Sequence, residues 1–141
     1  MMKTAVITVI ITMILAGRIE AQWVQTSKTA GAVTAFAFFD GNLFAATSAG
    51  GVFVSTDSGD HWTAASMGLP ISPIRALVPF GRDLYAATWG DGVYKTTDNG
   101  NTWAPFNKGL PNSNIYALAA TRHRLFGSMA GCVFNSTNGG A

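Results

Sequence analysis

The chain has 141 residues, enough for one ordinary domain, and only 11% of them are charged, with a formal net charge of +2. No basic patch points to nucleic acid as a partner. Apolar residues make up 48% of the chain and are interrupted by 16 glycines, and such short apolar runs between glycines are typical of β structure.

The chain begins with an apolar run behind a short basic start. Residues 5–16 (AVITVIITMILA) follow Lys3, and this run is too short to span a bilayer comfortably. It fits the core of a signal peptide, with a small-residue cleavage pattern that ends at Ala21. We therefore expect residues 1–21 to be a signal peptide cleaved after Ala21, and a secreted or periplasmic protein without a stable membrane anchor. An uncleaved anchor is the alternative.

Cys132 is the single cysteine, so no internal disulfide can form. Its neighbours Val133 and Phe134 are apolar and predict that the thiol is buried.

Three copies of one repeat occupy residues 22–141, near 32–70, 73–111 and 114–141. Positions that keep a spacing of 41 residues include Val33, Ile74 and Ile115; Leu43, Leu84 and Leu125; and Trp62 and Trp103. So many coincident offsets indicate a true internal repeat.

Each copy contains four short runs typical of strands. In the second copy they are residues 74–80, 83–88, 92–96 and 102–106, separated by turn residues. Four strands in a period of about 40 residues are the signature of a propeller blade. We predict an all-β protein, a β-propeller of four-stranded antiparallel blades with about three blades present.

Two turns in the repeat resemble a known motif. STDSGDHW (residues 55–62) and TTDNGNTW (96–103) are similar to the Asp box, or BNR repeat, and STNGGA (136–141) follows it with Asn138 in place of the aspartate. The chain thus resembles the BNR/Asp-box β-propellers, which include sialidases, glucan-cleaving hydrolases and, more distantly, the photosystem II stability and assembly factor. In that family the motif is a hairpin turn between the third and fourth strands of a blade. The resemblance implies structural roles for Ser55, Asp57, Gly59, Trp62, Thr96, Asp98, Gly100, Trp103, Ser136, Asn138 and Gly140.

The residue types of the motif fit a turn. An aspartate can accept hydrogen bonds from backbone N–H groups that follow it, a glycine permits unusual backbone angles, and a tryptophan covers the turn. A calcium loop of the EF-hand type would need more spaced oxygen ligands and a final glutamate. We therefore expect structural turns, with no metal and no cofactor.

The repeats add up to about three blades, whereas closed propellers usually have four to eight. The third copy stops inside its motif at Ala141, and residues 22–24 resemble the outer strand of a blade. The sequence predicts the N-terminal part of a longer protein; the alternative is a homodimer that closes a six-bladed ring.

The resemblance does not carry the catalytic residues of these hydrolases over to this chain. The resemblance to sialidases implies a Tyr–Glu nucleophile pair, but the only glutamate is Glu20, in the predicted signal peptide. A hydrolase with two carboxylates needs a pair that flanks the scissile bond. Among the aspartates only Asp91 falls in a second-to-third strand turn, at the end where propellers of this kind commonly bind ligands.

We therefore expect a non-catalytic binding or assembly scaffold for a protein or carbohydrate ligand. Trp89 replaces Ser48 of the first copy, and Arg75 and Tyr116 occupy equivalent positions where the first strands begin. With Asp91 they are the candidate ligand-binding residues, although Trp89 could instead pack against the next blade. The alternative function is the N-terminal part of a sialidase-like or glucan-cleaving glycoside hydrolase whose catalytic residues lie beyond Ala141.

Overall fold

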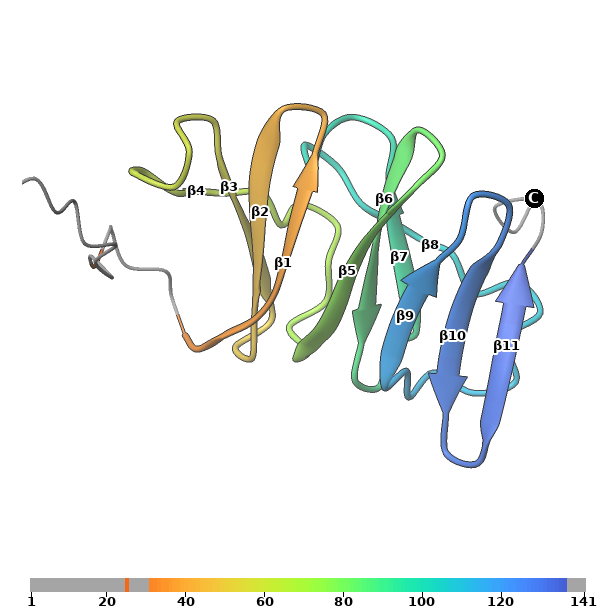
Figure 1. Cartoon of the computed structure of the whole chain (residues 1–141). Helices are drawn as coiled ribbons and strands as arrows, with labels where there is room; N and C mark the ends of the chain where they lie inside the picture. Colours follow the sequence, from red (N-terminus) through yellow and green to blue (C-terminus); the bar gives the residue numbers. More distant parts are fainter. Residues whose placement is uncertain (1–24, 26–30, 137–141) are drawn as a thin grey trace, which may run out of the picture.

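The computed structural model describes Gln25 and residues 31–136, which fold into three antiparallel sheets that stand side by side (Figure 1). The predicted signal peptide, together with Asn138 and Gly140 of the third predicted turn, lies outside these residues. No helix within the described part of the chain is long and apolar enough to cross a membrane.

Each repeat supplies one sheet, and within each sheet neighbouring strands follow one another in the chain. The first sheet contains β1 (Val33–Phe39), β2 (Asn42–Thr47), β3 (Gly51–Ser55) and β4 (Thr63–Ala64). The second contains β5 (Ile74–Phe80), β6 (Asp83–Thr88), β7 (Val93–Thr96) and β8 (Ala104–Pro105). The third contains β9 (Ala117–Ala120), β10 (Leu125–Met129) and β11 (Cys132–Ser136). The predicted all-β class with four-stranded antiparallel blades is confirmed.

Tight turns join the strands where the sequence places glycine. Asp40 and Gly41 link β1 to β2 with φ angles of 48° and 78°. Positive φ at both central residues is the mark of the two-residue hairpin whose twist matches that of the flanking strands. The Asp-Gly pair therefore fixes the register in which Phe39 lies opposite Asn42.

A bulge recurs near the start of the first strand of the first two sheets. Val33 pairs with Thr47 and Ala35 with Ala46, which leaves Thr34 as the extra residue. In β5 the same irregularity lies between Ile74 and Ala76, and Arg75 is extra there. A bulge redirects the side chain of the additional residue, so both residues leave the regular alternation of the strand.

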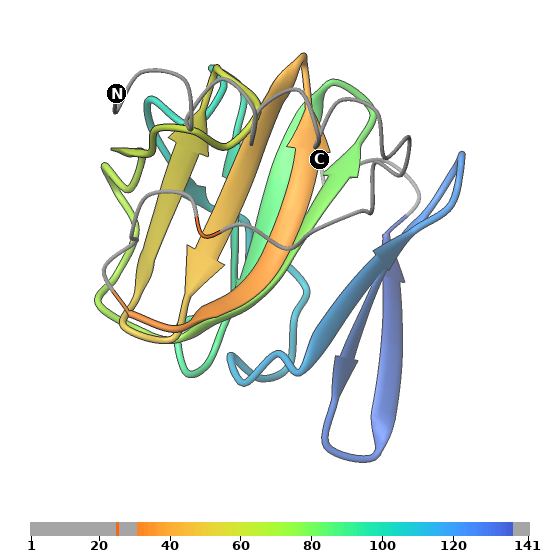
Figure 2. The same cartoon turned by 60° about the vertical axis from the view of Figure 1, so that its left-hand side comes forward.

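The sheets pack face to face, with β1 beside β5 and β5 beside β9 (Figure 2). Between the first and second sheets lies an apolar cluster that includes Phe44, Val52, Ile74, Leu84 and Trp103. Between the second and third lies another, which includes Tyr85, Val93, Ile115, Leu125 and Met129. Each large side chain that is fully buried there contributes about 1.5–3 kcal/mol, so these two seams hold the sheets together.

The prediction of a buried cysteine is wrong. Cys132 begins β11 and is exposed, and so is Val133 beside it. The apolar neighbours of Cys132 belong to a sheet that has a packing partner on one side only among the described residues, so an apolar sequence context does not lead to burial.

Candidate functional site

Three of the four predicted ligand-binding residues meet at one end of the sheets. The guanidinium carbon of Arg75 lies 4.9 Å from the centroid of the Trp89 ring. The ring of Tyr116 meets the same indole nearly at right angles, with 4.9 Å between the centroids and 84° between the planes. We call Arg75, Trp89 and Tyr116 the Trp89 cluster.

The cluster joins two sheets. Arg75 lies in β5, Trp89 directly follows β6, and Tyr116 directly precedes β9. Its end of the sheets is the one opposite the short turns β1–β2 and β5–β6 (Figure 1). The cluster therefore sits where the second and third sheets meet, at the end that the sequence assigned to ligand binding.

Backbone hydrogen bonds fix the positions of these side chains. The N–H of Trp89 donates to the carbonyl of Pro73 at 2.9 Å, which ties the strand end after β6 to the approach to β5. The N–H of Tyr116 donates to the carbonyl of Ser128 at 2.9 Å. The bulge supplies the third position, because it takes Arg75 out of the strand alternation.

The sequence left two roles open for Trp89, ligand binding and packing against the next blade, and the geometry has features of both. The indole is half-buried because Tyr116 of the next sheet packs on it, whereas Arg75 and Tyr116 themselves are exposed. Arg75 forms no ion pair with any carboxylate of residues 31–136, and its cation rests on the aromatic face. A cation–π contact of this kind contributes about 0.5–1 kcal/mol at an exposed site.

Asp91 lies in the same loop but faces elsewhere. Its carboxylate accepts a hydrogen bond from the hydroxyl of Ser72, and its backbone N–H donates to Oγ1 of Thr88 at 3.2 Å. Burial, assisted by the negative charge of Asp91, raises the pKa of Tyr94. The structure thus brings together Arg75, Trp89 and Tyr116, and leaves Asp91 bonded to Ser72 beside them.

The sequence did not single out the residues that hold this loop in place. The side-chain amide of Asn107 accepts from the N–H of Val93 at 2.7 Å and donates to the carbonyl of Asp91 at 3.0 Å. Ser66 occupies the equivalent position in the first repeat and both accepts from and donates to the backbone of Val52. A polar residue four positions after the repeated tryptophan was the signal that could have revealed this role.

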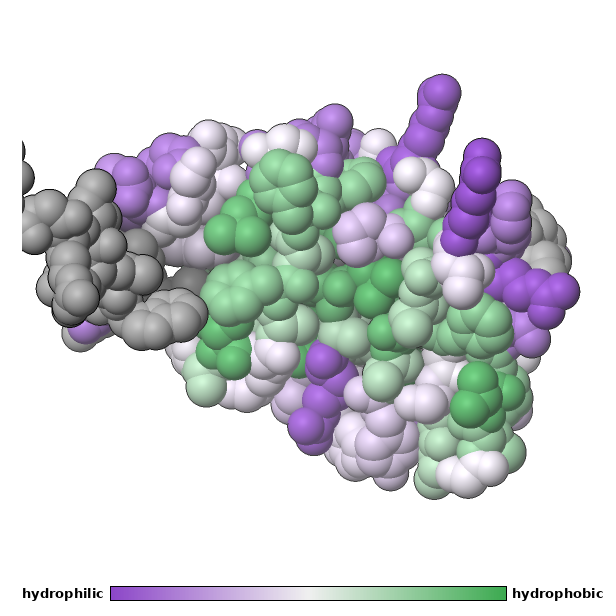
Figure 3. All heavy atoms as spheres, in the orientation of Figure 1, coloured by the Kyte–Doolittle hydropathy of each residue, from purple (hydrophilic) through white to green (hydrophobic). Residues whose placement is uncertain are grey.

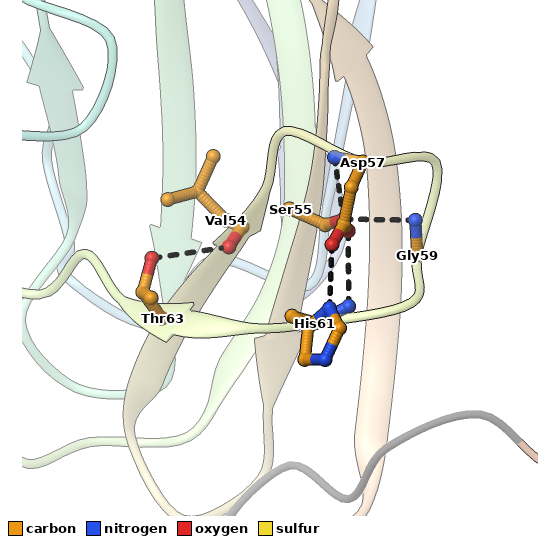
Figure 4. A network of polar contacts seen from close by, with 6 residues as sticks. All are labelled: Val54, Ser55, Asp57, Gly59, His61 and Thr63. Carbon is orange, nitrogen blue, oxygen red and sulfur yellow. Dashed lines mark hydrogen bonds and ion pairs between the residues drawn. The ribbon is translucent and has the colours of Figure 1, made fainter.

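The turn of residues 55–62, here the Ser55 turn, is held by two side chains (Figure 4). The hydroxyl of Ser55 donates to Asp57 at 2.8 Å and accepts the N–H of Gly59 at 2.8 Å. Asp57 accepts the N–H of His61 at 2.9 Å and lies 2.7 Å from Nδ1 of the same residue. These hydrogen bonds lower the pKa of Asp57, and its carboxylate in turn raises the pKa of His61.

The turn of residues 96–103, here the Thr96 turn, repeats the arrangement. Thr96 donates to Asp98 at 2.8 Å and accepts the N–H of Gly100 at 2.9 Å. Asp98 accepts the N–H of Thr102 at 2.8 Å and its hydroxyl at 2.5 Å. These bonds, those from Thr102 first, lower the pKa of Asp98. In both turns the aspartate contacts both the backbone N–H and the side chain of the residue four positions on.

His61 of the Ser55 turn stands at the position that Thr102 holds in the Thr96 turn. His61 is bonded to Asp57, four residues before it in the same turn. The histidine thus reaches the aspartate of its own turn as the threonine does in the other turn.

Asp40 and Asp83, near the turns at the other end of the sheets, also have partners of their own. Asp40 accepts from the amide of Asn99 at 2.6 Å, and Asp83 lies 3.4 Å from the ammonium of Lys95. No group of three or more histidine, cysteine, aspartate or glutamate side chains within the described residues could hold a metal ion.

Antiparallel sheets of this kind, stacked face to face along their first strands, define the protein as a β-propeller. The chain belongs to the DUF6242 β-propeller domain family, which matches residues 14–128. No curated protein sequence matches the chain.

Solved propellers share this fold at low sequence identity. YCF48 from Cyanidioschyzon merolae is 15% identical with a TM-score of 0.60, over 77% of this chain and 34% of that protein. PorZ of the type-IX secretion system of Porphyromonas gingivalis is 16% identical with a TM-score of 0.61, over 74% and 17%. The GH74 enzyme of Niastella koreensis is 23% identical with a TM-score of 0.54, over 82% and 18%. The chain therefore spans only 17–34% of these longer proteins.

Proposed function

We propose that this chain is a non-catalytic binding or assembly domain, with its ligand at the Trp89 cluster. The observation that carries the proposal is the meeting of an arginine without a carboxylate partner, an indole and an exposed phenol at one seam. Tryptophan, tyrosine and arginine are the side chains most enriched where binding energy concentrates.

The repeat itself does not require these residues. At the position of Trp89 the first repeat has Ser48 and the third has Ala130, and Thr34 stands at the position of Arg75. Thr34 serves the fold, because its hydroxyl donates to the carbonyl of Ile74 in the next sheet at 2.6 Å. Arg75 has no such structural bond among the described residues, which supports a role in binding.

The carboxylates support the non-catalytic part of the proposal. Asp57 and Asp98 are tied into turns, Asp40, Asp83 and Asp91 each have a partner, and Asp60 is an exposed residue of the Ser55 turn. A glycosidase with two carboxylates needs an acid and a base or nucleophile that flank the scissile bond. In this proposal any catalytic residues would come from outside the chain.

The chemistry of the cluster selects an anionic ligand with a flat or apolar face. The free cation of Arg75 would pair with a carboxylate, while Trp89 and Tyr116 would contact a sugar ring or an apolar side chain. An acidic peptide segment and an acidic glycan share these features. We further propose that the two turns are Asp boxes of the BNR type, and that residues 1–21 direct the protein out of the cytoplasm.

Calorimetric titration of the purified chain with poly-L-glutamate, polygalacturonate and neutral xyloglucan tests the proposal. We expect binding to one of the two acidic polymers and none to xyloglucan. Arg75→Gln removes the charge-assisted contact and should weaken this binding about tenfold, equivalent to about 1.4 kcal/mol. Trp89→Ala should weaken it as well.

Arg82→Gln is the matched control. Arg82 is also an exposed arginine and lies in the turn at the opposite end of the same sheet. Binding to neither acidic polymer, or equal losses for Arg82→Gln and Arg75→Gln, would contradict the proposed site. Hydrolysis of polygalacturonate or xyloglucan by the chain alone would contradict its non-catalytic character.

A further inference from the structure

Within residues 31–136 the first and third sheets each have one apolar face that no other sheet covers, and the two faces are of opposite kinds. We call the face that a sheet turns toward the preceding sheet its leading face, and the face toward the following sheet its trailing face. Both internal seams are formed by a trailing face and the next leading face.

The leading face of the first sheet is exposed where its equivalents are buried. Leu77 of the second sheet is 6% exposed in the first seam, whereas Phe36, at the same position of the repeat, is 60% exposed. Trp103 is buried in that seam, whereas Trp62 is half-buried and has the Phe36 ring 6.2 Å away, centroid to centroid. Figure 3 shows apolar side chains gathered over β1.

The trailing face of the third sheet shows the reverse. Val52 and Val93 occupy one position of the repeat on the trailing faces of the first two sheets and are 0% and 4% exposed. Val133 stands at that position in the third sheet and is 72% exposed. The side chains that would form a third seam are thus present, one set on the leading face of the first sheet and the other on the trailing face of the third sheet.

We propose that a second copy of this chain docks head to tail, with the trailing face of one third sheet on the leading face of the other first sheet. The contact would continue a seam that the chain already forms twice with residues of the same repeat positions. Leading and trailing faces are shaped for each other and not for themselves, so the contact is heterologous.

The number of sheets allows such a contact to close. Head-to-tail contacts form rings when the rotation between units closes. Two copies bring six sheets into one ring, and closed propellers usually have four to eight blades. Closure would cover the outer faces of the described sheets in both copies at once, so we expect a dimer of this chain.

Sedimentation velocity of the full chain over a range of concentrations tests the proposal. We expect a species of twice the chain mass of 14.8 kDa. Phe36→Asp and Val133→Asp each place a charge in the proposed seam, and each should weaken the dimer at least about tenfold. Both positions are exposed, so the fold of the chain itself should be retained.

Phe38→Asp is the matched control. Phe38 is also an exposed aromatic residue of β1, but Pro79, at the equivalent position, stays exposed although its seam is formed. Phe38→Asp should therefore leave the dimer intact. Association through the apolar N-terminal run would be unaffected by all three substitutions.

Mixing the two damaging variants separates head-to-tail docking from other arrangements. A mixed pair has one seam with both substitutions and one seam with none, so the dimer should partly return. A wild-type chain that stays monomeric at every concentration would overturn the proposal. So would a dimer that Phe36→Asp weakens and Val133→Asp does not, because this result indicates pairing of two leading faces.

Discussion

The Ser55 turn and the Thr96 turn have the same hydrogen-bond frame but different surroundings. In both, a hydroxyl holds the glycine N–H and an aspartate holds the residue four positions on. Only the Thr96 turn lies against another sheet, where the indole of Trp103 donates to the carbonyl of Ala65 at 2.8 Å. Local sequence determines the frame of the turn, and the neighbouring sheet determines how much the turn contributes to stability.

The largest difference in stability should be between alanine substitutions of the two tryptophans, Trp103 and Trp62. Trp103→Ala empties a buried site and should destabilise the chain by about 3–5 kcal/mol. Trp62→Ala removes a half-buried ring and should cost about 1–2 kcal/mol. Denaturant unfolding followed by circular dichroism measures both, and equal costs would show that the neighbouring sheet does not matter.

The second largest difference in stability is expected between alanine substitutions at the glycines of the two turns. Gly59 and Gly100 have φ angles of 102° and 83°, so alanine is strained at both. A Cβ on Gly100 would lie 3.0 Å from Cε1 of Phe44, whereas on Gly59 its nearest neighbour would be 3.8 Å away. Gly100→Ala should cost about 2–4 kcal/mol and Gly59→Ala about 1–2 kcal/mol. Thermal melts that rank them in the opposite order would contradict the crowding argument.

The aspartates should behave alike, because they belong to the frame that the turns share. Asp98→Ala and Asp57→Ala each leave backbone and side-chain donors of the turn without an acceptor. Both should lower the melting midpoint by similar amounts, less than Gly100→Ala does. An unchanged midpoint together with lost binding of a polymer or of calcium would instead make the turn a ligand site.

The smallest expected effect is a pH dependence confined to the Ser55 turn. Asp57 raises the pKa of His61, so the protonated histidine stabilises the folded chain. This stabilisation is fully present below the ordinary pKa of about 6.5 and is lost as the pH rises through the raised pKa. His61→Thr copies the residue of the other turn, which does not titrate. The midpoint advantage of the wild type over His61→Thr should shrink as the pH rises above about 6.5, and a constant difference would contradict the linkage.

The repeat made most of the fold predictable. Strands β5 and β6 begin and end where the sequence placed them, because glycines, aspartates and apolar alternation define them locally. The exposure of Cys132 was not predictable in the same way. Burial depends on what covers the face of a sheet, and an apolar context records only that the face could be covered.

The Trp89 cluster was predictable as a set of candidates but not as a contact. The alignment of the repeats placed Arg75 and Tyr116 at equivalent positions. Trp89 stood out because the first repeat has Ser48 at the same position. Their meeting required the bulge in β5 and the angle between two sheets, which arise from tertiary packing. The bond between Ser72 and Asp91 depends on the same packing.

The bond from Trp103 to Ala65 also implies an order of assembly on the ribosome. The outer edge of the first sheet is secured by an indole 38 residues further along the chain, and Trp103 also donates its backbone N–H to Met67 at 2.8 Å. Domains fold from the N-terminus as they are synthesised. The first blade would therefore leave the exit tunnel before the residue that bonds to its outer edge. The two bonds from Trp103 could form only after the last strand of the second blade has followed.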